Sequence, residues 1–155
     1  MGTDHWGHFG VNEAIKIARA VEKYNLAYIE DIIPWQYTDQ WKEITLSTTT
    51  PTQTGEDIYM LYGGFKELID KRAVDIVHPD PTTAGGILET KRIGDYDSHH
   101  GVGFMLHNAA GPVSFLGSVH AAAANVNFMW LAGGNRPDFR TLNWWIRMIW
   151  CESFD

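Results

Sequence analysis

Five ionisable residues recur along the chain at nearly constant intervals. Asp4, Glu30, Glu56, Asp80 and His107 follow one another every 24 to 27 residues, and each closes a stretch predicted to be a strand. Three carboxylates gathered at one place stay ionised at neutral pH only beside a positive charge. All-oxygen ligands suit Mg²⁺ or Mn²⁺ better than zinc. Asp4, Glu30 and Glu56 are therefore candidate metal ligands, although each taken alone could equally face solvent or cap the next helix.

The last two of these residues form a candidate pair for proton transfer. Asp80 and His107 close consecutive predicted strands, so the carboxylate could accept a hydrogen bond from one imidazole nitrogen and leave the other nitrogen free. A lone histidine is more often structural, and the His99-His100 pair reads as surface. Beside a cation that stabilises an oxyanion, a His/Asp pair suits removal of a proton α to a carboxylate.

Alternating strands and helices must position these residues. Apolar runs and helical patterns alternate along the chain, which is typical of consecutive βα units and a parallel sheet. Asn12 is the expected N-cap of the first helix. The spacing of the five residues matches one unit of a ~250-residue, eight-unit (β/α) barrel, in which the carboxyl ends of the strands share one rim. The predicted helices are 12–24, 38–46, 64–70, 86–98 and 112–124, and the predicted strands include 26–30, 51–56, 74–79, 102–107 and 127–131.

A set of short motifs carries a family resemblance. TD ends at Asp4, YIED contains Glu30, TGED contains Glu56, and HPDPTTAGGILETKRI and MLHNAAGP contain Asp80 and His107. From about residue 3 to residue 130 the chain resembles the C-terminal barrel domain of the enolase superfamily, in its mandelate racemase/muconate lactonizing enzyme family.

The resemblance implies a reaction as well as a fold. It implies Mg²⁺ on Asp4, Glu30 and Glu56, and a proton-transferring pair of His107 with Asp80. The muconate lactonizing branch carries lysine where this chain has Asp80, so the chain is more similar to mandelate racemase and the sugar-acid dehydratases. Dehydration of an aldonate-type sugar acid is the expected reaction, with racemisation or epimerisation as the alternative.

Side chains near the rim are candidates for substrate contact. His5 and His8 follow the first predicted ligand closely, and Trp35 follows the second metal-bearing strand, where it could wall a sugar site. For the two histidines a plain loop position is at least as reasonable, and for Trp35 ordinary rim packing is the alternative. A zinc hydrolase suggested by His5 and His8 would need a His-x-His strand motif that the sequence lacks.

The resemblance covers only part of a barrel. The units correspond to strands 3 to 8 of the family barrel, so we expect a partial, open (β/α) barrel over residues 1–131. Open sheet edges favour self-association or a homo-oligomer, and a non-catalytic fragment that acts through those edges is a further alternative. Residues 132–155 read as a divergent Trp-rich tail, with Leu142, Trp145, Ile146 and Ile149 on one face of a helix.

The charged and apolar composition of the chain argues against nucleic acids and membranes as partners. The 155 residues include 12 Lys and Arg against 19 Asp and Glu, for a net charge of −7. A broad cationic surface for nucleic acid or anionic lipid is therefore not expected, and the apolar run 142–150 is far shorter than the ~20 residues of a membrane span. With a single cysteine, Cys151, and no apolar leader after Met1, a cytoplasmic protein acting on a small-molecule sugar acid is expected.

Overall fold

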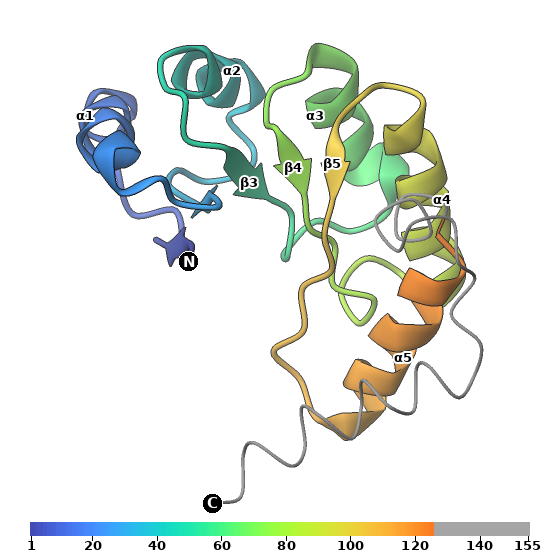
Figure 1. The fold of residues 1–155 in the computed structure, drawn as a ribbon. Helices are drawn as coiled ribbons and strands as arrows, with labels where there is room; N and C mark the ends of the chain where they lie inside the picture. The colour runs from blue at the N-terminus through green and yellow to red at the C-terminus, as the bar shows by residue number, and fades with distance from the viewer. Residues whose placement is uncertain (126–155) are drawn as a thin grey trace, which may run out of the picture.

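A computed structural model describes residues 1–125 of the chain, which form one layer of parallel strands and a curved layer of helices (Figure 1). The strands pair in chain order, β1-β2-β3-β4-β5, and every pairing is parallel. The strands are β1 (Thr3–Asp4), β2 (Ile29–Glu30), β3 (Thr52–Thr54), β4 (Ile76–Val77) and β5 (Gly103–Phe104). The helices are α1 (Val11–Val21), η1 (Glu22–Tyr24), α2 (Thr38–Leu46), η2 (Leu61–Gly63), α3 (Phe65–Lys71), α4 (Ile87–Ser98) and α5 (Pro112–Ala123).

The order of the strands confirms the predicted open α/β arc. Each strand from β1 to β4 is followed by a helix and then by the neighbouring parallel strand, and β5 is followed by α5, as in a (β/α) barrel. Five strands lie in the described part of the chain, and the sixth predicted strand, 127–131, lies outside the described residues, as does the predicted helical tail. Because all five strands run the same way, the segments that follow their carboxyl ends lie along one edge, toward the bottom of Figure 1.

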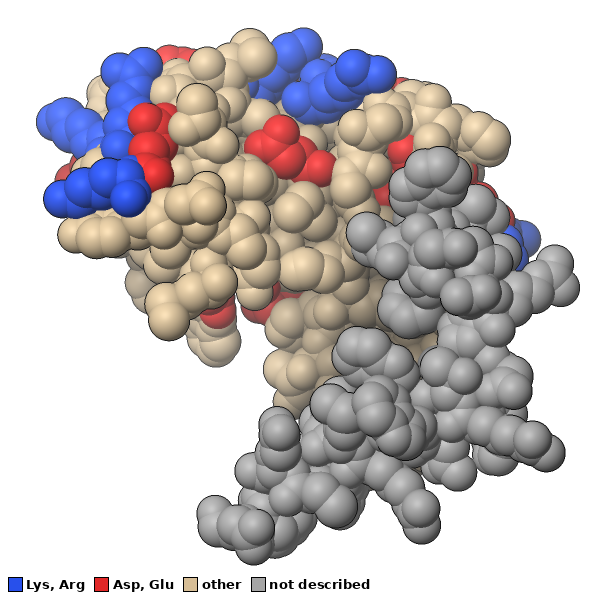
Figure 2. Space-filling view, viewed as in Figure 1, with Lys and Arg blue, Asp and Glu red and all other residues tan. Residues whose placement is uncertain are grey.

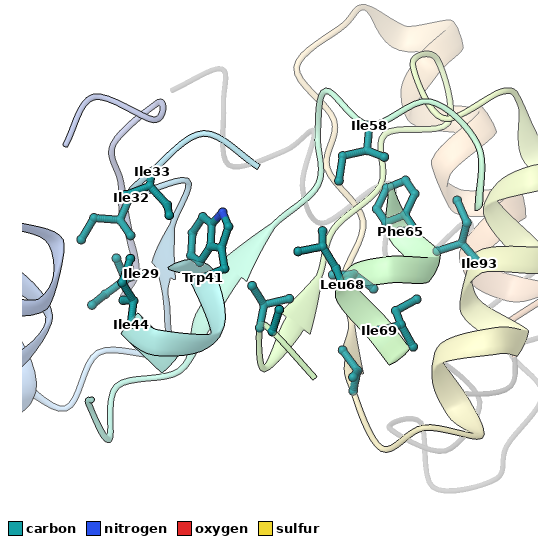
Figure 3. Close-up of a cluster of buried hydrophobic side chains, with 14 of the residues drawn as sticks. Ile29, Ile32, Ile33, Trp41, Ile44, Ile58, Phe65, Leu68, Ile69 and Ile93 are labelled. Carbon is teal, nitrogen blue, oxygen red and sulfur yellow. The ribbon is translucent and has the colours of Figure 1, made fainter. Parts of the chain in front are cut away.

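Helices pack in sequence order on the outer face of the sheet. Contacts join α1 to α2, α2 to α3, α3 to α4 and α4 to α5. Ala14 and Ala18 of α1, one helical turn apart, are fully buried on the inner face of the helix, as the 3.6-residue period of an amphipathic helix requires. Isoleucine, leucine and aromatic side chains from the strands and helices form one apolar core, in which Trp41 and Phe65 are the bulkiest members (Figure 3).

Several boundaries of helices and strands differ from the predictions. The first helix begins at Val11 with Gly10 as its N-cap, so Asn12 is not the cap: Gly10 has the extended backbone that an N-cap needs, and its carbonyl accepts from the N–H of Ala14. The same helix ends at Val21, and a 3-10 turn closes it because Asn25 adopts a left-handed conformation. The strands are only two or three residues long, although flanking backbone bonds such as Ala27 N–H to Met1 O continue the pairing.

Basic side chains lie on one side of the molecule in the view of Figure 2. Lys and Arg gather in its upper part, where Asp and Glu lie among them, and further acidic side chains show at the lower edge of the tan surface. No helix in residues 1–125 combines the length and apolar character that a bilayer crossing demands.

Candidate active site

The five predicted site residues all lie at or just beyond the carboxyl ends of the strands. Asp4 and Glu30 are the last residues of β1 and β2 and face one another in register. Glu56, Asp80 and His107 follow β3, β4 and β5 by two or three residues. The topology therefore brings side chains from five separate units to one edge of the sheet, where (β/α) barrel enzymes place their chemistry.

His107 and Asp80 form the hydrogen-bonded pair that the sequence predicts. Nδ1 of His107 lies 2.9 Å from Oδ2 of Asp80, so the imidazole N–H can donate to the carboxylate. The backbone N–H and the hydroxyl of Thr82 donate to Oδ1 of Asp80 at 2.8 and 2.6 Å. Burial alone would raise the pKa of Asp80, but the hydrogen bonds from Thr82 and His107 outweigh it and lower that pKa. Asp80 is thus held as a carboxylate that orients the imidazole.

The other nitrogen of His107 faces Glu56. Nε2 lies 2.6 Å from Oε2 of Glu56, so one imidazole bridges two carboxylates from different strands. Burial raises the pKa of Glu56, the nearby His107 opposes that shift, and Asp31 adds to it. A substrate that exchanges a proton with Nε2 must first displace Glu56 from this contact.

Glu30 is buried in a polar cluster of its own. Its Oε2 accepts from Nε2 of Gln53 at 3.0 Å, and its Oε1 lies 3.2 Å from Nδ1 of His78. Burial raises the pKa of Glu30, His78 acts against that shift, and the charges of Asp31 and Asp4 reinforce it. A nearby cation would relieve the cost of keeping this carboxylate ionised.

Asp4 occupies the exposed end of the acidic series. Its Oδ1 accepts the backbone N–H of Trp6 at 3.2 Å, and its charge reaches Glu30 on the neighbouring strand. The donor chemistry of Asp4, Glu30 and Glu56 fits Mg²⁺: all three offer carboxylate oxygen, and buried Glu30 and half-buried Glu56 have raised pKa values that a divalent cation would reverse.

A second trio, Glu30, Asp31 and His78, lies close enough together to hold one ion. Each of these side chains offers one ligand atom, and the three atoms lie within 4.8 Å of one another. Sequence analysis missed Asp31 and His78, although each adjoins a predicted site residue: Asp31 follows Glu30, and His78 lies two positions before Asp80. Their closeness in sequence to the predicted site residues is the signal that could have identified them as further site residues.

A pocket of about 320 Å³ opens beside these side chains. Trp35, a predicted wall, lines it together with Trp6, which is 72% exposed. His5 and His8 are not among its lining residues; His5 contacts Thr3 through Nε2 and packs its ring on Phe9, and burial lowers its pKa against the opposing charge of Asp4. The pocket is lined by Trp6, Gly7, Asp31, Ile33, Pro34, Trp35, Gln36, Gly55, Glu56 and Asp57.

Known proteins share both the sequence and the fold. Residues 1–146 match the enolase C-terminal domain-like family. A D-xylonate dehydratase of Haloferax volcanii is 33% identical over 145 residues, which cover 94% of this chain and 34% of that enzyme. An arabinonate dehydratase of Saccharolobus solfataricus is 34% identical over 119 residues, covering 77% of this chain and 31% of that enzyme.

A solved structure agrees with the sequence comparison. The mandelate racemase/muconate lactonizing enzyme-like protein of Rubrobacter xylanophilus superposes with a TM-score of 0.78 and 36% identity, over 81% of this chain and 32% of that one. The chain thus spans about a third of the length of the relatives it matches. A family match over nearly the entire sequence, together with the shared fold, shows that the protein belongs to the enolase C-terminal domain-like family, in the mandelate racemase/muconate lactonizing enzyme group.

Proposed function

We propose that the protein carries the metal and proton-transfer residues of a Mg²⁺-dependent dehydratase that acts on an aldonate-type sugar acid. The observation that carries this proposal is the pairing of His107 with Asp80 beside Glu56, at the sheet edge where Glu30 and Asp4 also end their strands. Relatives named D-xylonate and arabinonate dehydratase support the substrate class.

Asp4, Glu30 and Glu56 are the residues that would hold Mg²⁺, on which enolase superfamily enzymes depend in general. When bound, the ion would act as a Lewis acid toward the substrate carboxylate and stabilise the negative charge that develops when the α-proton leaves. The pocket favours such a counterion, because Asp31, Glu56 and Asp57 line it and no Lys or Arg of residues 1–125 does.

His107 is the proposed proton carrier. Asp80 fixes its Nδ1–H, so Nε2, once released from Glu56, can take a proton from C2 of the substrate or give one to the departing 3-hydroxyl. Loss of the C2 proton and of the 3-hydroxyl as water leaves an enol, which rearranges to a 2-oxo-3-deoxy acid. In the proposed site Trp6 and Trp35 form apolar walls of the pocket beside these groups.

A substrate screen tests the proposal. The chain is incubated with Mg²⁺ and a library of sugar acids, and ¹H NMR in D₂O follows both loss of water and exchange of the α-proton. We expect a 2-oxo-3-deoxy product that is abolished by Glu56→Gln and retained by Glu67→Gln. Glu67 serves as the control because it lies on the exposed face of α3, where its carboxylate pairs with Lys71.

Two outcomes decide between the proposal and its alternatives. Exchange of the α-proton without loss of water would assign a racemase or epimerase instead. If neither reaction occurs and the chain does not bind Mg²⁺, the catalytic function is refuted and a non-catalytic fragment is favoured. Sedimentation velocity would then measure the predicted self-association of that fragment through its sheet edges.

A further inference from the structure

His78 is a buried imidazole that the proposed dehydration does not use. It is 1% exposed and follows β4, between the side chains of Glu30 and Asp31. Its Nδ1 lies 3.2 Å from Oε1 of Glu30, within hydrogen-bonding distance. Its Nε2 has no hydrogen-bond partner among residues 1–125. A buried polar nitrogen left in this state is unfavourable and calls for an explanation.

The contact with Glu30 favours one tautomer of the neutral ring. A carboxylate only accepts, so Nδ1 beside it carries the proton and Nε2 presents a lone pair. That lone pair faces Oδ2 of Asp31 at 3.7 Å, which is too long for a hydrogen bond. Nε2 of the neutral imidazole and Oδ2 of Asp31 can both donate an electron pair, and they lie close enough together to share one cation.

Asp31 is held toward this position by its own surroundings. Its φ of +43° lies in the left-handed region, where a residue other than glycine is strained. The hydroxyl of Thr54 donates to its Oδ1, which leaves Oδ2 for a second partner. Asp31 also lines the pocket, so an ion could arrive from solvent and keep water ligands.

We propose that Glu30, Asp31 and His78 form a binding site for a divalent transition-metal ion of the zinc class. In this site Nε2 of His78 and Oδ2 of Asp31 bind the ion, while Glu30 orients the imidazole through Nδ1–H. In many metalloproteins a histidine binds the metal through one ring nitrogen and donates the N–H of the other to a carboxylate. Ligands ~2.1 Å from zinc lie ~3.4 Å apart at a tetrahedral angle, so the 3.7 Å separation needs only a small closure.

The nitrogen ligand sets the selectivity of this site. Imidazole suits zinc, cobalt and nickel, whereas Mg²⁺ prefers oxygen ligands and gives up its water reluctantly. The site shares Glu30 with the proposed Mg²⁺ ligands but includes neither Asp4 nor Glu56. It does not rest on the dehydration chemistry, and the two proposals can fail separately.

Calorimetric titration with ZnCl₂ in excess Mg²⁺ tests the site. The wild-type chain is compared with four variants: His78→Gln, His107→Gln, Asp4→Asn and, as an exposed control, His99→Gln. We expect one zinc ion per chain, bound at least about tenfold more weakly by His78→Gln and equally well by the other three variants. Loss of Mg²⁺ binding in Asp4→Asn with zinc binding intact would separate this site from the proposed function.

A second measurement on the wild-type chain covers the case in which His78→Gln does not fold. In ¹⁵N NMR of the imidazoles, zinc should shift Nε2 of His78 while Nδ1 keeps its proton. Three outcomes would each overturn the proposal. The first is an unchanged zinc affinity in His78→Gln, and the second is loss of zinc binding in His107→Gln instead. The third is a His78 ring that is protonated on both nitrogens and whose ¹⁵N signals do not shift when zinc is added.

Discussion

Replacing Gly55 by alanine tests the coupling between the core and the site. Gly55 is buried directly before Glu56, at a φ of +144° that side chains rarely adopt. An added Cβ would lie 2.7 Å from Cε1 of Phe65, a fully buried core residue, and 3.2 Å from the backbone nitrogen of His78. The methyl group therefore meets both the core and the backbone directly after β4.

The cost follows from these two effects. Backbone strain of this kind costs about 1–3 kcal/mol, and overpacking of a filled core costs about 1–3 kcal/mol more. Gly55→Ala should therefore lower the free energy of unfolding by roughly 2–6 kcal/mol, a large share of the 5–15 kcal/mol typical of a domain. With a urea m-value of about 1–3 kcal/mol/M, the unfolding midpoint should fall on the order of 1 M or more.

Tryptophan fluorescence during urea unfolding measures this change, because Trp41 is fully buried and its indole N–H donates to Pro34 O. Gly63→Ala is the matched control, since its added Cβ meets no atom within 4 Å, and it should stay within about 0.5 kcal/mol of the wild-type chain. If both variants unfold at the wild-type midpoint, the close packing of Gly55 against Phe65 is wrong.

Three further substitutions probe the site and the helices. Asp80→Asn leaves too few acceptor atoms for Thr82 and His107 together, so urea unfolding should show a loss of about 1–3 kcal/mol; an unchanged midpoint would contradict this. The free energy of unfolding of Glu30→Gln, compared with that of the wild-type chain in the absence of metal, should increase as the pH rises from 4 to 7. A carboxyl group whose native pKa is raised contributes stability below its unfolded pKa and loses it as the pH passes the native value; an advantage that shrinks with pH would reverse the assignment. Gly117→Ala, inside α5 with free space around the added methyl group, should stabilise by about 0.5–1 kcal/mol in thermal unfolding, and a loss of stability would show that the space is filled.

The sequence predicted the βα order and the sheet edge because both depend on local periodicity. Helix 112–124, for example, differs from α5 by one residue. Residues 26–28 form part of a predicted strand but not of β2, because strand assignment depends on the partner's register as well as on an apolar run. Asp31 and His78 were missed for the same kind of reason. Their proximity depends on the β2-β3-β4 pairing and on the left-handed backbone of Asp31, which no periodic pattern encodes.

The carboxylates of the site fall into two physical groups. Glu30 and Glu56 have raised pKa values, so their ionisation is unfavourable in the metal-free chain, and a bound cation would recover that free energy. Asp80 has a lowered pKa, because Thr82 and His107 already satisfy its oxygen atoms. A carboxylate satisfied in this way has little to gain from a cation and is suited to orienting an imidazole. The same contrast explains why metal binding and proton transfer are expected on different strands of one sheet edge.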